Sequence, residues 1–293
     1  MNPLAPQNMI PPHRLIEAYG HNRSKALGQH FLKDRSVLER IVVATGLMPG
    51  ETILEIGPGP GVLTCQLLAT GARVIAIEKD RRAAAFLKNQ LPAMLGGEAA
   101  DRLVVIEGDA LEVGLQEAFA GHGGQEPLRA AGNLPYNVGT AILMRLLEAG
   151  FSECVLMFQR EVARRLSSAP GKRSYGSLSL AVQARADAKI LMEVEPEAFS
   201  PAPKVHSSVV QFRVPASPRV PSQERELFER AARAAFSTRR KTIRNSLKKA
   251  LKGITVEELD AALEAAEIPA RWRAEVVSLE KFLALSKHLE PWL

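Results

Sequence analysis

One short stretch constrains the fold more than any other part of the chain. It reads Ile53-Leu-Glu-Ile-Gly-Pro-Gly-Pro-Gly-Val-Leu-Thr64: an apolar run, an acidic residue, three glycines at alternate positions and the start of a helical pattern. Glycine tolerates the backbone conformations of a tight turn and lets a ligand approach the main chain, and the N–H groups at the start of a helix attract polar groups. We therefore expect a strand–turn–helix unit that holds a nucleotide-like ligand.

Apolar segments alternate with amphipathic helical segments through most of the chain. The expected strands are residues 53–56, 73–77, 103–106, 128–131, 154–158, 190–194 and 208–214. This alternation predicts an α/β fold with a Rossmann-like, doubly wound parallel sheet covered on both faces. The last two strands are joined by a proline-rich loop without a helix, so they could form an antiparallel pair at the edge of that sheet.

Changes in composition divide the 293 residues into three parts. Residues 1–23 are rich in proline and are expected to form a flexible arm, residues 24–214 the α/β domain, and residues 215–293 a small all-helical domain. The first residues lack the pattern of a signal peptide, and no apolar run reaches the length of about 20 residues that a bilayer requires. The expected location is the cytoplasm, with Cys65 and Cys154 as small core residues.

The residues around the glycines distinguish between two ligands. A dinucleotide site of the type G-x-G-x-x-G needs a third glycine at position 62, which is Val62, whereas Glu55–Gly61 has the E-x-G-x-G-x-G pattern typical of S-adenosylmethionine sites. Glu78 ends the second strand and can accept hydrogen bonds from ribose hydroxyls, and Asp109 follows the third strand, where it can bind the adenine amino group. Either acid could instead cap a helix, but acidic groups on successive strand ends favour S-adenosylmethionine as the cofactor.

A second motif, Asn133-Leu134-Pro135-Tyr136, follows the fourth strand and predicts the acceptor of the methyl group. The amino group of adenine is a poor nucleophile because its lone pair is delocalised into the ring. The Asn133 side-chain carbonyl and the Leu134 backbone carbonyl can accept its two hydrogens, which favours the tetrahedral nitrogen that attacks a methyl group. Pro135 stiffens the turn, and Tyr136 can stack on the base. An ordinary turn with a core tyrosine is the alternative.

With these motifs in place, the sequence closely resembles the ribosomal RNA adenine dimethyltransferase family from about Ser24 to Val214, and more weakly through the helical tail. The motifs that carry the resemblance are residues 25–32 (KALGQHFL), 55–61, 78–80 (EKD), 108–110 (GDA), 133–136 (NLPY), 158–163 (FQREVA) and 199–205 (FSPAPKV). The resemblance implies a class I methyltransferase fold and the transfer of two methyl groups to N6 of each of two adjacent adenosines. Those adenosines lie in a hairpin near the 3′ end of small-subunit (16S) rRNA.

The resemblance also implies roles for individual residues. Donor contacts are implied at His30, Leu32, Gly57, Glu78, Asp109 and Asn133, to which we add the neighbours Gly59 and Ala110. Phe199 matches an aromatic residue that sandwiches the flipped adenine against Tyr136. This chain departs from the family at two positions, with His30 where asparagine is common and His206 where an acidic residue is usual.

Basic residues are concentrated in the helical tail, and the chain as a whole carries a net charge of +6. Between Arg225 and Lys252 the only acids are Glu226 and Glu229, and no acid follows Arg230 within this segment. A single-signed run of this kind favours contact with RNA phosphates over a merely solvated helix face. The residues expected to bind RNA are Arg239, Arg240, Lys241, Arg244 and Lys248. We expect a monomer that acts on a pre-ribosomal small-subunit particle, and no metal, since the six histidines lack ligand spacing.

Three other functions remain open at the level of sequence. The same chemistry could be directed at large-subunit rRNA, as in antibiotic-resistance methylases, or at DNA. A ribosome-assembly factor that has the fold without catalytic activity is a non-enzymatic alternative. Hydride transfer with a dinucleotide is disfavoured by Val62.

Overall fold

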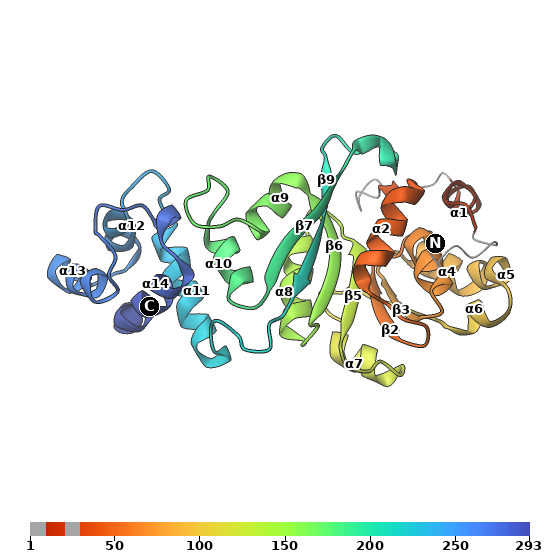
Figure 1. Ribbon diagram of the computed structural model, residues 1–293, viewed down its shortest axis with the longest axis horizontal. Helices are drawn as coiled ribbons and strands as arrows, with labels where there is room; N and C mark the ends of the chain where they lie inside the picture. Colours follow the sequence, from red (N-terminus) through yellow and green to blue (C-terminus); the bar gives the residue numbers. More distant parts are fainter. Residues whose placement is uncertain (1–9, 21–29) are drawn as a thin grey trace. The chain divides into compact units, whose positions relative to one another are not determined.

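The computed structural model describes residues 10–20 and 30–293, and it divides into two compact units (Figure 1). The sheet unit comprises the described residues up to Ala163 together with Lys189–Arg213. The helical unit comprises Arg164–Ala188 and Val214–Leu293. In the described part of the chain, no helix is long and apolar enough to cross a membrane.

A mixed sheet of seven strands forms the centre of the sheet unit. Its strands are β2 (Thr52–Ile56), β3 (Arg73–Glu78), β4 (Leu103–Glu107), β5 (Arg129–Asn133), β6 (Glu153–Gln159), β7 (Asp187–Val194) and β9 (Ser207–Arg213). They are arranged in the order β4-β3-β2-β5-β6-β9-β7; the first five are parallel, and β9 pairs antiparallel with β6. The α/β class and all seven predicted strands are confirmed, and the last two strands lie at one edge as expected.

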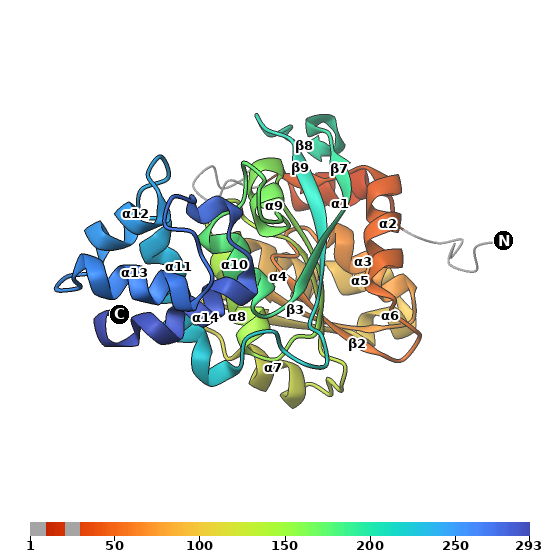
Figure 2. The same cartoon turned by 60° about the vertical axis from the view of Figure 1, so that its left-hand side comes forward.

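Both faces of this sheet are covered, which explains why its strands are continuously apolar. Side chains alternate along a strand, so Ile53, Val74 and Val155 belong to a core on one face, together with buried side chains of α2 (Arg35–Thr45), α3 (Val62–Ala69) and α4 (Arg81–Asn89). Figure 2 shows α2 and α8 on opposite sides of the sheet. The remaining helices of this unit are α1 (Pro12–Tyr19), α5 (Leu91–Leu95), α6 (Gly97–Asp101), α7 (Leu115–Gly121), α8 (Gly139–Glu148) and most of α9 (Arg160–Leu166).

Helix α1 differs from the flexible arm expected for residues 1–23. Residues 12–19 form a helix whose Leu15, Ile16 and Tyr19 are buried in the same core as α2 and α3. The physical reason is an apolar stripe at helical spacing, with a proline at the first turn where its missing N–H costs nothing. Residues 1–9 and 21–29, including the expected domain boundary between residues 23 and 24, lie outside the described part.

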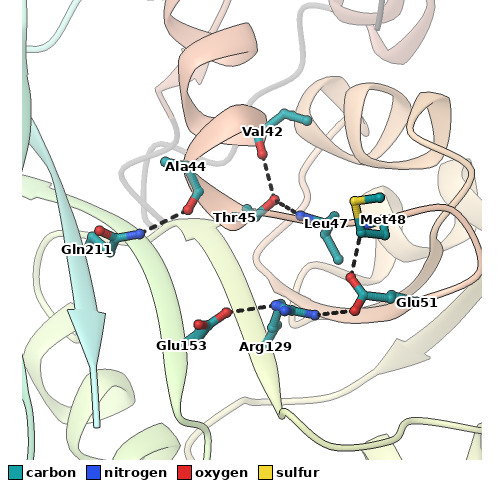
Figure 3. Close-up of polar contacts among 9 residues, drawn as sticks. All are labelled: Val42, Ala44, Thr45, Leu47, Met48, Glu51, Arg129, Glu153 and Gln211. Atoms are coloured by element: carbon teal, nitrogen blue, oxygen red, sulfur yellow. Dashed lines mark hydrogen bonds and ion pairs between the residues drawn. The ribbon is translucent and has the colours of Figure 1, made fainter. Parts of the chain in front are cut away.

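At the amino ends of the parallel strands, a polar cluster joins three neighbouring strands (Figure 3). Arg129 at the start of β5 forms ion pairs of 2.8 Å with Glu51, which precedes β2, and with Glu153, which begins β6. The arginine side chain is 14% exposed, and its two carboxylate partners are 33% and 36% exposed, so the pairs are only partly shielded from solvent. On the same side, Gln211 of β9 donates to the Ala44 carbonyl of α2 at 3.0 Å. The cluster fixes the start of β2, β5 and β6, and thereby aligns their carboxyl ends.

The helical unit has its own core. Its helices are α10 (Ser177–Gln183), α11 (Arg225–Ala235), α12 (Ile243–Ala250), α13 (Val256–Ala265) and α14 (Leu279–Leu289). Contacts group residues 164–188 with the C-terminal helices, which differs from the expected boundary at residue 214. Tyr175 explains the difference, because its buried ring packs edge-on against Phe236 and its hydroxyl donates to the Val277 carbonyl at 3.0 Å. The side chains that hold this segment in place are far apart in the sequence.

Candidate active site

The glycine turn between β2 and α3 has the conformation that the sequence predicted. Gly57, Gly59 and Gly61 have φ values of 67°, 56° and 82°, in the left-handed region that favours glycine. A Cβ atom at Gly59 would lie 2.9 Å from the Phe31 ring, whereas at Gly57 nothing comes closer than 4.0 Å. The turn is therefore closed on one side by Phe31 and open at Gly57, where a ligand can meet the main chain.

Glu78 lies beside this turn at the end of β3 and is 6% exposed. Its carboxylate accepts hydrogen bonds from the Gly59 N–H at 2.9 Å and the Asp80 N–H at 2.8 Å. Burial raises the pKa of Glu78, and these two N–H groups partly offset the rise. Glu78 thus ties the glycine turn to the end of the neighbouring strand and lies in the wall of the same pocket.

Asp109 follows β4 and faces the same pocket, as does Ala110. Its carboxylate accepts from the Lys79 ammonium at 2.6 Å and from the Leu111 N–H at 2.9 Å. The hydrogen bond from Lys79 is the main reason that the pKa of Asp109 is held below its usual range. The acid is therefore ionised at neutral pH, and it still has lone pairs for a further donor because each oxygen accepts more than one hydrogen bond.

The Asn133–Tyr136 turn joins β5 to α8 and lines the same pocket as Glu78. The Asn133 side-chain amide donates to the His30 carbonyl at 2.9 Å, which leaves its own oxygen directed away from that bond. Leu134 is 2% exposed, and the Pro135 carbonyl accepts from the Gly139 N–H at 2.9 Å as α8 begins. The Tyr136 hydroxyl lies 2.7 Å from the Ser207 hydroxyl, and burial raises the pKa of Tyr136.

A two-stranded sheet that the sequence did not predict completes this site. Strand β1 (Phe31–Leu32) pairs antiparallel with β8 (Phe199–Ser200), with Leu32 opposite Phe199. Both Leu32 and Phe199 are buried in the core, at 4% and 1% exposure, and neither lines the pocket. His30, immediately before β1, does line it. Motif spacing alone gave no signal for this pairing, although apolar residues recur in both segments.

The structure thus brings most of the predicted site residues into one pocket. Its walls contain His30, Gly57, Gly59, Glu78, Asp109, Ala110, Asn133, Leu134, Pro135 and Tyr136. His206 is not among these pocket residues, and its Nδ1 atom lies 2.9 Å from the Glu195 carboxylate. Where the family usually has an acidic residue, this chain thus has a histidine beside an acidic residue. Residues 10–20 and 30–293 contain no group of three or more histidine, cysteine or acidic side chains that could hold a metal ion.

A second buried carboxyl group, that of Glu55, lies on the strand that leads into the glycine turn. Glu55, on β2, is 1% exposed, and its Oε2 atom has no hydrogen-bond partner within the described residues. Burial, with a smaller contribution from the charge of Glu78, raises the pKa of Glu55 to about 8. This pKa favours the neutral form at pH 7, and at 1% exposure the side chain belongs to the buried interior.

The five basic residues predicted to bind RNA lie in the helical unit, around the turn between α11 and α12. Three have internal partners: Arg239 donates to the Arg173 carbonyl at 2.6 Å, Arg244 pairs with Asp260, and Lys248 donates to the Ile254 carbonyl. Arg240 and Lys241 are exposed, and their side chains have no hydrogen bond or ion pair to any residue that the structure describes. Within the described residues, three of the five predicted RNA-binding side chains therefore have partners in the protein, and Arg240 and Lys241 do not.

Comparison with known proteins agrees with this geometry. A model of the family "Ribosomal RNA adenine dimethylase" matches residues 20–290. The "Ribosomal RNA small subunit methyltransferase A" of Dinoroseobacter shibae is 44% identical over 96% of this chain and 97% of its own length. The protein of the same name from Syntrophotalea carbinolica is 41% identical over 92% of this chain and 98% of its own.

Two solved structures resemble the whole fold. A dimethyladenosine transferase from Plasmodium falciparum superposes with a TM-score of 0.72 at 25% identity, over 89% of this chain and 98% of that one. The 23S rRNA methyltransferase ErmE superposes with a TM-score of 0.65 at 25% identity, over 89% of this chain and 99% of that one. The pocket, the near full-length relatives and the family match agree: this chain belongs to the ribosomal RNA adenine dimethylase family.

Proposed function

We propose that this protein is an S-adenosylmethionine-dependent dimethyltransferase of small-subunit rRNA. Its targets are the N6 amino groups of two adjacent adenosines in the 3′-terminal hairpin, within a pre-ribosomal particle in the cytoplasm. One observation carries the proposal: Asn133 is held by the His30 carbonyl at 2.9 Å in the same pocket as the glycine turn and Glu78. The same cavity is thus lined by Asn133, whose amide oxygen can accept a hydrogen bond from an amino group, and by Glu78, whose carboxylate can bind a nucleoside.

The donor site fits S-adenosylmethionine. The open main chain at Gly57 accommodates a ligand that a side chain there would obstruct, Glu78 accepts from ribose hydroxyls, and Asp109 accepts from the adenine amino group. Bound in this way, the cofactor supplies an electrophilic methyl group on a sulfonium sulfur. The protein therefore has only to bind the two reactants and align them.

At the acceptor site, Asn133 and the Leu134 carbonyl orient the target amino group. The Asn133 oxygen and the Leu134 backbone oxygen accept its two hydrogens, which moves the nitrogen lone pair out of conjugation with the ring. Pro135 fixes the turn that presents both acceptors, and Tyr136 offers a ring face to the base. No strong general base is needed, because the nitrogen becomes very acidic once it is alkylated.

The donor site gives a direct test of Glu78. We expect Glu78→Gln to raise the dissociation constant of S-adenosylmethionine about 100-fold, because a neutral amide replaces two charge-assisted hydrogen bonds. Calorimetric titration of the purified protein measures this constant. Glu107→Gln is the matched control, since Glu107 ends the neighbouring strand but pairs with Arg81 at the surface. A change of less than about threefold for Glu78→Gln would contradict the assignment.

RNA recognition is assigned mainly to Arg240 and Lys241, whose side chains are free to meet phosphates. The double variant Arg240→Ala, Lys241→Ala is expected to weaken binding to immature small-subunit particles about 10-fold and to reduce the salt dependence of log K by about 1.5. Filter binding at several salt concentrations measures both. Lys287→Ala is the control, because Lys287 pairs with Glu224. Arg239, Arg244 and Lys248 are expected to contribute less, and equal salt slopes for the double variant and the unaltered protein would refute this surface.

Methylation mapping separates the remaining functions. Incubation with S-adenosylmethionine and immature small-subunit particles should modify two adjacent adenosines near the 3′ end, as read by primer extension. Modification of large-subunit rRNA alone would favour the function named for ErmE. Near full-length relatives named for the small subunit favour the first outcome. An assembly factor without activity would give no incorporation on either RNA.

A further inference from the structure

Helix α1 supports the donor side of the pocket through Tyr19. This residue ends the helix and is 6% exposed, and its ring packs edge-on against Phe31, with centroids 5.7 Å apart and planes inclined by 87°. A second edge-on contact, at 5.6 Å, joins the same ring to Phe86 of α4. Phe31 lies against the glycine turn and lines the pocket. The helix therefore buttresses a residue of the pocket wall, although it precedes the first residue of the family match.

The Tyr19 hydroxyl reaches a second element of the donor site. It donates to the Asp80 carboxylate at 3.3 Å, and the Asp80 backbone N–H donates in turn to the Glu78 carboxylate at 2.8 Å. Burial, followed by the charge of Asp80, raises the pKa of Tyr19 to about 12, so the hydroxyl keeps its proton as a donor. Asp80 is also fixed by capping α4, where it accepts from the Arg82 N–H at 2.9 Å.

These contacts close on themselves around the glycine turn. Five residues, each in contact with the next, form the circuit: Gly59, Phe31, Tyr19, Asp80, Glu78 and, through its N–H at 2.9 Å from the Glu78 carboxylate, Gly59 again. Strand β1, which carries Phe31, has only two residues, so side-chain packing must supply much of what holds this ring in place. Tyr19 closes the circuit between the Phe31 ring and the carboxylate side of the turn.

We propose that Tyr19 is a positioning residue of the donor site, which holds the Phe31 ring and the Asp80–Glu78 pair in the places that S-adenosylmethionine requires. Tyr19 is not among the residues that line the pocket, so it acts through these neighbours. A wall that is ordered before binding lowers the cost of ordering it on binding, so donor affinity should depend on Tyr19 more than the rate of methyl transfer does. The inference rests on the proposed function, from which it takes the donor.

Two substitutions separate the ring of Tyr19 from its hydroxyl. Tyr19→Leu keeps an apolar side chain in the core but removes both contacts, and we expect it to raise the dissociation constant of S-adenosylmethionine about 10-fold. Tyr19→Phe removes only the bond to Asp80 and should raise this constant no more than about threefold. Leu38→Ala is the control, because Leu38 is fully buried in the same core, on α2, and lies outside the circuit. It should lower the midpoint of thermal unfolding and leave the dissociation constant within about twofold.

Calorimetric titration at a temperature where every variant is folded measures donor binding. Methyl incorporation into immature small-subunit particles at saturating donor measures kcat, which should stay within about twofold for Tyr19→Leu. A lowered unfolding midpoint with an unchanged dissociation constant would overturn the inference, because Tyr19 would then be an ordinary core residue. An equal loss of affinity in Leu38→Ala would overturn it as well. Failure of the unaltered protein to bind S-adenosylmethionine would instead refute the proposed function, whereas normal binding by all variants would refute the role of Tyr19 alone.

Discussion

Asn133→Ala is expected to lower kcat for methyl transfer by about 100-fold or more while RNA binding is retained. The side-chain amide donates to the His30 carbonyl and Asn133 lines the pocket, and its oxygen is the acceptor that we propose for the target amino group. Alanine removes that acceptor, and the nitrogen lone pair then remains conjugated with the base. Removal of one preorganised hydrogen bond at a reacting group commonly costs a factor of 100 to 1,000, or about 3 to 4 kcal/mol.

Single-turnover kinetics with saturating donor and small-subunit particles give this rate without a contribution from donor affinity. Asn89→Ala is the matched control, because Asn89 is exposed at the end of α4, remote from the pocket lining. Asn133→Ala also distinguishes an enzyme from an assembly factor, since a non-catalytic role predicts that this variant supports ribosome assembly normally. A rate within about fivefold of the unaltered protein would exclude the role assigned to Asn133.

The second large effect concerns stability and pH at Glu55. Its carboxyl group is fully buried, and burial raises its pKa to about 8 from the ordinary value of 4.5. A group whose pKa is higher in the folded state binds a proton more tightly there, so its contribution is fully present below pH 4.5 and is lost as the pH rises towards 8. Between pH 5 and 8.5 this single group should lower the free energy of unfolding by about 4 kcal/mol.

Glu55→Gln removes the titration while keeping the size of the side chain. The unaltered protein loses stability over this pH range and the variant does not. We therefore expect the free energy of unfolding of the variant minus that of the unaltered protein to rise by about 4 kcal/mol between pH 5 and 8.5. Urea unfolding of the full chain at both pH values measures the difference, and the comparison cancels the titrating groups that do not interact with Glu55. Glu98→Gln, at an exposed position of α6, supplies the control. A difference between the two proteins that does not change with pH would show that Glu55 is ionised in the folded state.

The parts predicted from sequence are those that depend on local signals. Apolar runs gave all seven strands of the main sheet, and the alternating glycines gave the turn before α3. Strand ends then placed Glu78, Asp109 and Asn133 together, because parallel strands present their carboxyl ends at one edge of a sheet. A local signal also existed for α1, namely its apolar stripe at helical spacing. The neighbouring prolines led instead to the prediction of a flexible arm.

The parts that were missed depend on residues distant in the sequence. Strands β1 and β8 have two residues each, too few to show a period, and they exist because they pair with one another. The same holds for segment 164–188, which Tyr175 ties to the helical unit through Val277. Arg244 forms an ion pair with Asp260, and the run of basic residues in the sequence does not predict that partner.

The sequence by itself determined the fold class and the glycine turn at Gly57–Gly61, and it predicted the chemistry of the Asn133 motif, because each depends on residue types at fixed short spacing. Only the tertiary structure decided which side chains face the pocket. It buries Phe199, turns the His30 ring towards Tyr136 and holds Asn133 through the His30 backbone. The physical reason is that β1 and β8 gain their hydrogen bonds and apolar contacts only when the chain has brought residues 31–32 and 199–200 together.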